Sequence, residues 1–209
     1  MYVPAAFQVD DRDKIAAFIR EHSFATLVTQ HEGVPFASHV PLLYEQDAGP
    51  LGTLVGHLAR PNRQWQDVAG VAEGISALAI FHGPHTYISP TWYGEPNTVP
   101  TWNYIAVHAT GRLKLMEDQQ QLLQLLTRAV NIYESAQSQP WRLEDQNPEF
   151  TQKLLGGIVG FEITIEKLEG KWKLNQNQSA QRRERVIAKL SESLRHQDRE
   201  VARLMKESP

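Results

Sequence analysis

The stretch GHLARPNRQW (56–65) carries the residues best suited to bind an anion. It follows an apolar run that predicts a strand, and Pro61 stands where proline favours the start of a helix. Backbone N–H groups are free at such a start, and an arginine can converge with them on a phosphate. The candidate ligands are His57, Arg60, Asn62 and Arg63. A solvated turn that contains a helix cap is the alternative interpretation.

A second polar stretch, GKWKLNQNQ (170–178), places two lysines on one side of a predicted strand and a run of amides after it. A solvent-facing sheet edge is the alternative here. His82 and His85 have a spacing that suits a metal, but no third ligand is close in sequence, so we favour structural roles and expect no metal site.

The usual catalytic signatures are missing from the sequence. It contains no Gly-x-Gly-x-x-Gly, no Walker lysine loop, no Gly-x-Ser-x-Gly and no His-Glu-x-x-His. No pair of residues stands out as general acid and base. The catalytic residues therefore stay unassigned, and enzymatic activity stays open.

An aromatic segment, SPTWYGEPNTVPTWNY (89–104), holds three prolines, two tryptophans and two tyrosines. Proline fixes φ and removes a backbone donor, so the segment predicts a rigid loop. Large rings on a loop need a cover, which can be the protein's own core, a partner chain or a flat ligand.

The elements around these stretches alternate between strand and helix patterns. Period-two alternation and apolar runs predict strands at 24–29, 36–44, 53–59, 101–116 and 158–174, with a turn at Gly170. The run at 75–81 predicts a strand buried on both faces. Helices are predicted from Asp10 or Asp11 to about His22 and at 62–69, 118–136, 148–155 and over the last twenty-five or so residues. Six or seven strands in meander order favour an antiparallel barrel decorated with helices.

Composition and charge narrow the class of protein. The chain has 209 residues, no cysteine and a net charge of −3, with no long apolar run and no leader-like start, so we expect a cytoplasmic protein without a membrane span. Residues 182–206 hold eight Lys/Arg against four Asp/Glu. We expect a main domain at 1–178 and a basic, amphipathic helical extension at 179–209.

Several segments together resemble the PaiB-like family of FMN-binding negative transcriptional regulators. They are HLARPNRQW, FHGPHTYISPTWY, VPTWNYIAVHATGRL and LLGGIVGFEITIEKLEGKWKLNQNQ, and the likeness runs from MYVPAAF to about residue 195. The resemblance implies the FMN-binding split barrel, and a homodimer with each FMN at the subunit interface. The rings of the aromatic segment would then wall the cofactor and the partner subunit.

The resemblance also implies roles for individual residues. Arg60 and Asn62 would hold the phosphate, with His57 beside the ribityl chain or the ring, although Asn62 stands where flavin oxidases of this fold usually have lysine. Ser38 and His39 would lie near the isoalloxazine. Further candidates for cofactor binding are Ser89, Trp102, Asn103, Lys173, Gln176 and Asn177.

Three functions follow from these expectations. The first is a flavin-binding regulator that acts on transcription directly or through a partner, although the acidic body and the lack of a recognisable helix-turn-helix speak against direct DNA binding. The second is a flavin oxidoreductase acting on a small molecule. The third is a haem-binding split barrel with His57 or His85 as axial ligand.

Overall fold

The structure is a computed structural model that describes residues 1–208. Within them the chain forms eight strands and five α-helices. It divides into two compact units. Unit 1 comprises Met1–Phe18, Phe81–His108 and the described residues from Glu169 onward, and unit 2 comprises Ile19–Ile80 and Ala109–Leu168. The predicted class, a mainly antiparallel sheet with added helices and a helical C-terminal segment, is confirmed.

A curled sheet forms the body of unit 2. The strands follow the order β3-β2-β6-β7-β8-β5-β4, in which β3 and β4 stand at opposite ends. Only Leu42 separates these two strands in the chain, so the sheet must curl until its ends approach each other, as in a barrel. The strands are β2 (Phe24–His31), β3 (Val34–Pro41), β4 (Leu43–Glu45), β5 (Thr53–Ala59), β6 (Ile75–Ile88), β7 (Thr101–Leu115) and β8 (Ile158–Lys173).

The first hairpin of unit 2 shows how local sequence sets the register. β2 and β3 pair from Phe24 opposite Pro41 to His31 opposite Val34, which leaves a two-residue loop. Both loop residues, Glu32 and Gly33, have positive φ values of 50° and 80°. This is the conformation that a tight hairpin turn needs, and glycine adopts it without strain.

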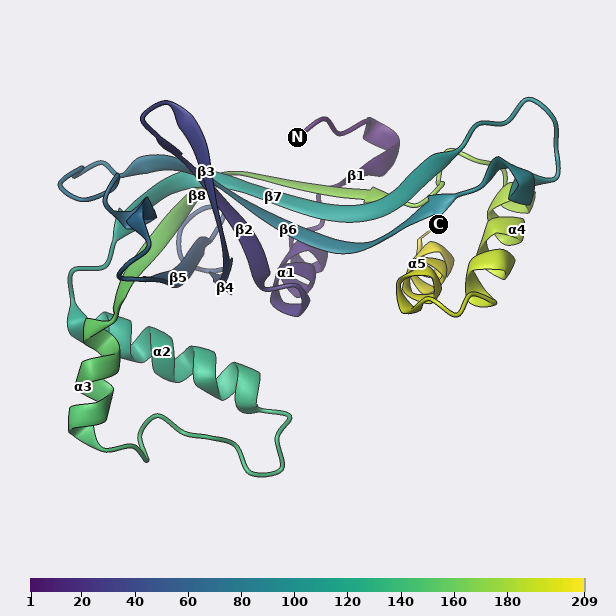
Figure 1. The fold of residues 1–209 in the computed structure, drawn as a ribbon. Coiled ribbons are helices and arrows are strands. Elements are labelled where there is room, and N and C mark those ends of the chain that lie inside the picture. Colours follow the sequence, from purple (N-terminus) through teal and green to yellow (C-terminus); the bar gives the residue numbers. More distant parts are fainter. Residues whose placement is uncertain (209) are drawn as a thin grey trace. The chain divides into compact units, whose positions relative to one another are not determined.

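Two helices pack on the outer surface of this barrel. They are α2 (Gln119–Glu134) and α3 (Pro148–Gly156), which contact each other where their ends adjoin (Figure 1). Their apolar sides form a second core with β5, centred on Val55, Leu122, Leu125 and Leu155. Asp118 and Asn147 cap the two helices by accepting hydrogen bonds from backbone N–H groups.

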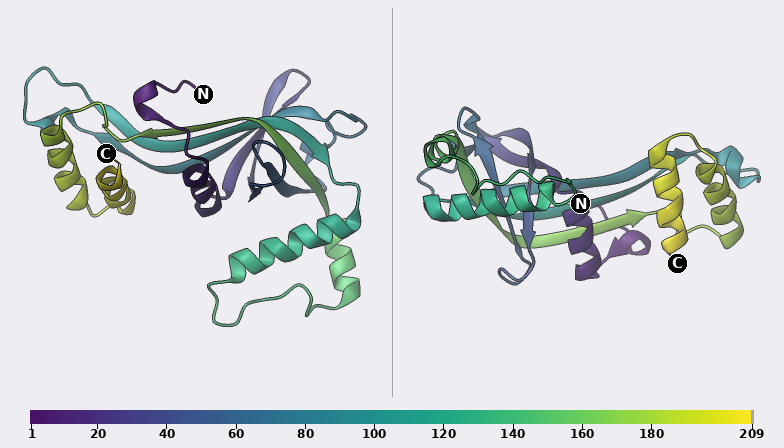
Figure 2. Two further views of the ribbon diagram at one scale, coloured as in Figure 1. Left: turned by 180° about the vertical axis from the view of Figure 1, so that it is seen from behind. Right: turned by 90° about the horizontal axis from the view of Figure 1, so that it is seen from below.

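Unit 1 contains the far ends of β6, β7 and β8. The short strand β1 (Gln8–Val9) pairs with β8, and α1 (Arg12–Glu21) follows it, capped by Asp11. Phe18 of α1 meets Trp172 of β8 edge to face, with ring centroids 5.2 Å apart. The unit also contains η3 (Pro90–Tyr93), α4 (Ala180–Ser191) and α5 (His196–Glu207). The last two helices pack side by side, as Figures 1 and 2 show.

Two predictions about the strands are wrong. β6 extends to Ile88 and alternates between buried and less buried positions, so the run at 75–81 is not buried on both faces. Gly170 is no turn, because β8 continues through it and Gly170 pairs with Val9 of β1. A Cβ atom at this position would lie 2.9 Å from the Val9 carbonyl oxygen, so glycine allows the strands to approach closely. The strand predicted at 101–116 is confirmed, because β7 covers Thr101–Leu115, and the last four residues of the aromatic segment belong to it.

The prediction of one long C-terminal helix is also wrong. The helix breaks after Ser191, and Ser193 Oγ accepts a hydrogen bond from the backbone N–H of Arg195 at the start of α5. The break turns α5 so that Val201 and Met205 are buried, whereas Leu194 in the turn is 96% exposed. Burial of the apolar side of α5 outweighs the continuity of one helix.

None of the helices in the described residues is both long and apolar enough to cross a membrane.

Candidate functional site

The turn after β5 is held by Arg60. The Arg60 guanidinium donates from Nε to the Gly156 carbonyl oxygen at 2.7 Å and from Nη2 to the Ile158 carbonyl oxygen at 2.9 Å. Its backbone carbonyl oxygen accepts a hydrogen bond from Trp65 Nε1 at 2.9 Å, so both the side chain and the backbone of Arg60 hold the turn in place. Of its three side-chain nitrogens, only Nη1 makes no hydrogen bond to residues 1–208. A phosphate contact by Arg60 stays a prediction, and Nη1 is the group available for it.

The next residues of this turn bring two predicted residues together. Asn62 Nδ2 donates to Ser38 Oγ of β3 at 2.8 Å, and Asn62 Oδ1 accepts from the Gln64 backbone N–H at 3.0 Å. Asn62 thus caps η2 (Arg63–Trp65) itself, and one of the N–H groups expected for an anion is already used. The Ser38 hydroxyl still has its own proton to donate.

The two predicted histidines of unit 2 lie in different environments. His39 is exposed on β3, bonded to Thr26 Oγ1 at 3.1 Å and stacked against the Phe24 ring, with centroids 6.4 Å apart. His57 lies on β5 opposite Gly160, and burial lowers the pKa of its imidazole. His57 is therefore neutral at neutral pH, with one ring nitrogen as donor and one as acceptor.

Unit 1 carries a cluster of rings on one face of β6 and β7, here called the ring face. Trp102 is 53% exposed and Tyr87 is 42% exposed, with ring centroids 5.9 Å apart. His85 adjoins Trp102 at 6.4 Å and His82 at 4.8 Å. Neighbouring side chains on these strands point the other way, because Thr86 and Asn103 are buried and bond to α5. Alternation thus separates a face covered by α5 from the ring face.

Lys173 is the last residue of β8, and its side chain lies against the start of β7. Its ammonium group donates to Thr101 Oγ1 and to the Trp102 carbonyl oxygen, the latter at 2.7 Å. Burial and the charge of Lys171 lower the pKa of Lys173. Lys173 also lines a hollow of about 260 Å³, together with Thr98, Asn175, Asn177, Gln178 and Arg182. These side chains are mainly hydrogen-bond donors and would suit an anionic or hydroxyl-rich ligand.

Three other predicted residues make contacts within the protein. Ser89 caps η3 by accepting from the Thr91 backbone N–H, and Gln176 bonds to backbone groups of Leu174 and Trp172. Asn103 is fully buried, donates to Met205 Sδ at 3.4 Å and leaves Oδ1 without a partner in residues 1–208. Their roles in cofactor binding stay predictions.

Sequence reasoning overlooked Tyr87 and Arg182. Strict alternation would place Tyr87 with the buried Phe81, and Tyr87 is exposed because the alternation of β6 changes phase at Pro84 and His85. Arg182 gave no signal in the sequence either. It reaches the hollow from α4, and its ion pair with Glu95 at 2.6 Å depends on packing between segments far apart in the chain.

The residues of unit 1 fit FMN in kind. The ring face offers flat aromatic surface to an isoalloxazine, and the hollow beside Lys173 offers cations, amides and hydroxyls to a phosphate and a ribityl chain. When bound, FMN would supply redox chemistry, and the protein would bind and orient it.

The fold is that of known flavoproteins. A flavocytochrome, Anf3 from Azotobacter vinelandii, superposes with a TM-score of 0.61 at 16% identity over 79% of this chain and 69% of that one. An FAD and heme binding protein from Mycobacterium smegmatis gives 0.60 at 13% identity over 79% and 73%. At such identities the likeness concerns the fold alone, and it confirms the predicted class, the flavin-binding split barrel.

Sequence comparison defines the family. The "Putative FMN-binding domain" family matches residues 1–167. Protease synthase and sporulation protein PAI 2 of Bacillus subtilis is 35% identical over 207 residues, which cover 99% of this chain and 97% of the relative. The chain belongs to this PaiB-like family of FMN-binding domains, as its sequence motifs predict. The family match supports FMN as the cofactor.

Proposed function

We propose that the protein binds FMN on the ring face of unit 1 and acts, as a homodimer, as a negative regulator of transcription. The observation that carries the proposal is the exposure of Trp102 and Tyr87 beside the partly buried Lys173. Exposed neighbouring rings are costly in water, and a flat cofactor and a second copy of the chain would cover them. The family match supports the cofactor, and the sequence resemblance supports the regulatory role.

Binding of FMN is tested by titration of the purified protein followed by flavin fluorescence and absorption. Trp102→Ala removes the more exposed ring of the pair Trp102 and Tyr87 and is expected to weaken FMN binding roughly five- to tenfold, as the loss of an aromatic contact of about 1 to 1.5 kcal/mol implies. Trp141→Ala is the matched control, because Trp141 is also an exposed tryptophan but lies in unit 2. Equal affinities of the two variants would remove the ring face from the proposal.

The homodimer is tested by analytical ultracentrifugation. Trp102→Glu places a charge in the proposed interface and is expected to shift the protein toward the monomer, whereas Trp141→Glu leaves it unchanged. A protein that sediments as a monomer at all concentrations, with and without FMN, would contradict this part of the proposal.

Direct contact with DNA would involve α5 and the turn before it. Arg195, Arg199 and Lys206 there have no acidic partner within residues 1–208, whereas Arg203 is paired with Glu200 and Glu207. Neutralisation of about three phosphates predicts a slope of roughly −2.7 for the logarithm of affinity against the logarithm of salt concentration. Fluorescence anisotropy with a labelled duplex measures this slope, and the absence of binding at low salt would leave action through a protein partner.

A further inference from the structure

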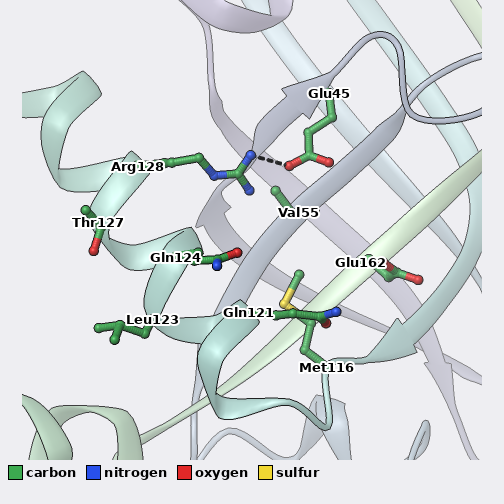
Figure 3. Close-up of a pocket in the computed structure, with 9 residues that line it drawn as sticks. All are labelled: Glu45, Val55, Met116, Gln121, Leu123, Gln124, Thr127, Arg128 and Glu162. Atoms are coloured by element: carbon green, nitrogen blue, oxygen red, sulfur yellow. Dashed lines mark ion pairs between the residues drawn. The ribbon is translucent and has the colours of Figure 1, made fainter.

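A large hollow lies in unit 2, beside the second core. It measures about 600 Å³ and is bordered by α2 on one side and by β4, β5 and β8 on the other. Pockets for small organic ligands range from about 300 to 1,000 Å³, so the hollow has the size of a ligand site. Figure 3 shows Gln121, Gln124 and Arg128 extending from α2 on the side that faces these strands. None of its lining residues belongs to unit 1, which contains the ring face.

The charged groups of the hollow do not balance. Arg128 Nη1 on α2 pairs with Glu45 Oε1 on β4 at 2.6 Å, as the dashed line in Figure 3 shows. Glu162 on β8 is half-buried, and its carboxylate makes no hydrogen bond or ion pair with any group in residues 1–208. Two carboxylates and one guanidinium leave one negative charge, and it resides on Glu162.

The surface next to Glu162 is apolar. Glu162 stands opposite the buried Val55 in the pairing of β8 with β5, so the two side chains lie on the same face of the sheet. Met116 and Leu123 also border the hollow and pack against the second core. The amide groups of Gln121 and Gln124 provide carbonyl oxygens at the rim.

We propose that this hollow binds a small organic cation, an ammonium group carried on an aliphatic chain. The ammonium would pair with Glu162 and donate to the glutamine carbonyls, and the aliphatic chain would lie on Val55, Met116 and Leu123. An anionic ligand is disfavoured, because Arg128 is already neutralised by Glu45 and a carboxylate would face the charge of Glu162. The site does not involve FMN, so this inference does not depend on the proposed function.

Three probes of equal length separate charge from apolar contact: n-hexylammonium, hexanol and hexanoate. Isothermal titration calorimetry of the full chain is expected to show one hexylammonium per chain, bound at least fivefold more tightly than hexanol, with hexanoate weakest. Equal binding of the three probes would mean apolar contact alone and would overturn the proposal. A preference for hexanoate would identify Arg128 as the anchor and overturn it equally.

Two variants, Glu162→Gln and Arg128→Ala, are expected to change hexylammonium binding in opposite directions and thereby locate the bound cation. Glu162→Gln keeps the side-chain volume and is expected to weaken hexylammonium binding roughly five- to tenfold, to the level of hexanol. Glu166→Gln is the matched control on the same strand, since Glu166 is exposed and pairs with Arg112 away from the hollow. Unchanged binding in folded Glu162→Gln would refute the site.

Arg128→Ala removes the guanidinium that neutralises Glu45 and should give the hollow a second unpaired carboxylate. It is expected to tighten hexylammonium binding severalfold, a result that general damage to the fold cannot produce. Weaker or unchanged binding in this variant would contradict the charge argument even if Glu162→Gln failed to fold.

Discussion

The contact between β6 and α5 offers the sharpest test of how unit 1 is held together. Thr86 Oγ1 donates to Asp198 Oδ1 at 2.6 Å, and Ser193 Oγ donates to Asp198 Oδ2 at 2.6 Å. Both Thr86 and Asp198 are buried, with 2% and 7% of their surface exposed. Asp198 is therefore a buried carboxylate whose two oxygens are each satisfied by one hydroxyl, and α5 is fixed to the sheet by this pair.

Thr86→Val removes one of these hydroxyls and changes the side-chain volume very little. A hydrogen bond to a charged group contributes about 1.5 to 3 kcal/mol, and Asp198 Oδ1 would stay buried without a donor. We expect the free energy of unfolding to fall by about 2 kcal/mol, measured by urea denaturation followed by circular dichroism. Hydrogen exchange of the α5 amides should accelerate, because the lost contact anchors that helix.

Thr164→Val is the matched control for this change. Thr164 lies on β8 and is exposed, so its replacement should alter stability by no more than about 0.5 kcal/mol. If Thr86→Val also stays within about 0.5 kcal/mol of the wild type, the hydroxyl does not stabilise the buried carboxylate and the reasoning fails.

Three further predictions concern unit 2. His31 forms a hydrogen bond of 2.7 Å with Asp67, and this bond and the negative charge of Asp67 raise the pKa of His31. The pair therefore stabilises the fold below the unfolded-state pKa of histidine, and this contribution is lost as pH rises through the folded-state pKa. NMR titration should show a His31 pKa above that of a free histidine, and this pKa should decrease in the Asp67→Asn variant. Burial lowers the pKa of His57, so this histidine should titrate at a lower pH than a free histidine. Its protonation on acidification should then destabilise the folded state. An ordinary His57 pKa measured by NMR would contradict its burial. Gly111→Ala places a Cβ atom 2.1 Å from a carbonyl oxygen of β8, so the free energy of unfolding measured by urea denaturation should fall by more than about 2 kcal/mol. In the control Gly156→Ala the added Cβ meets open space, and the decrease should be far smaller. Similar decreases in the two variants would refute the steric argument.

The sequence predicted most elements because their signals are local. The apolar run of β5 and the capping residue Asp11 of α1 each depend on a few neighbouring residues, and both are confirmed. The errors at Gly170 and after Ser191 have a different origin. Each depends on a segment far along the chain, since β1 pairs with Gly170 and β6 supplies Thr86 to Asp198 of α5.

The sequence allows the residue types of the candidate site to be predicted, but not the contacts that these residues make. The sequence indicates that Arg60 is a cation at a strand end, and a phosphate is the natural partner for such a residue. It does not indicate that Gly156 and Ile158, almost a hundred positions later, present carbonyl oxygens to the same guanidinium. An arginine or lysine near a predicted anion site therefore shows that a hydrogen-bond donor is present there. Which acceptor it binds can be determined only from the folded structure.

The same distinction applies to the basic C-terminal segment. Three of its arginines stabilise unit 1 itself: Arg182 pairs with Glu95, Arg183 donates to the Met205 carbonyl oxygen, and Arg185 donates to the carbonyl oxygen of Tyr93. The positive charge of residues 182–206 thus overstates what a nucleic acid would meet, because cations bonded within the protein release no counterions from phosphates. The charge of this segment is better explained as the means by which α4 and α5 are attached to η3 and to each other. Any contact of this segment with DNA must then come from the few cations of α5 and its preceding turn that have no acidic partner within residues 1–208, which is why a shallow salt dependence is expected.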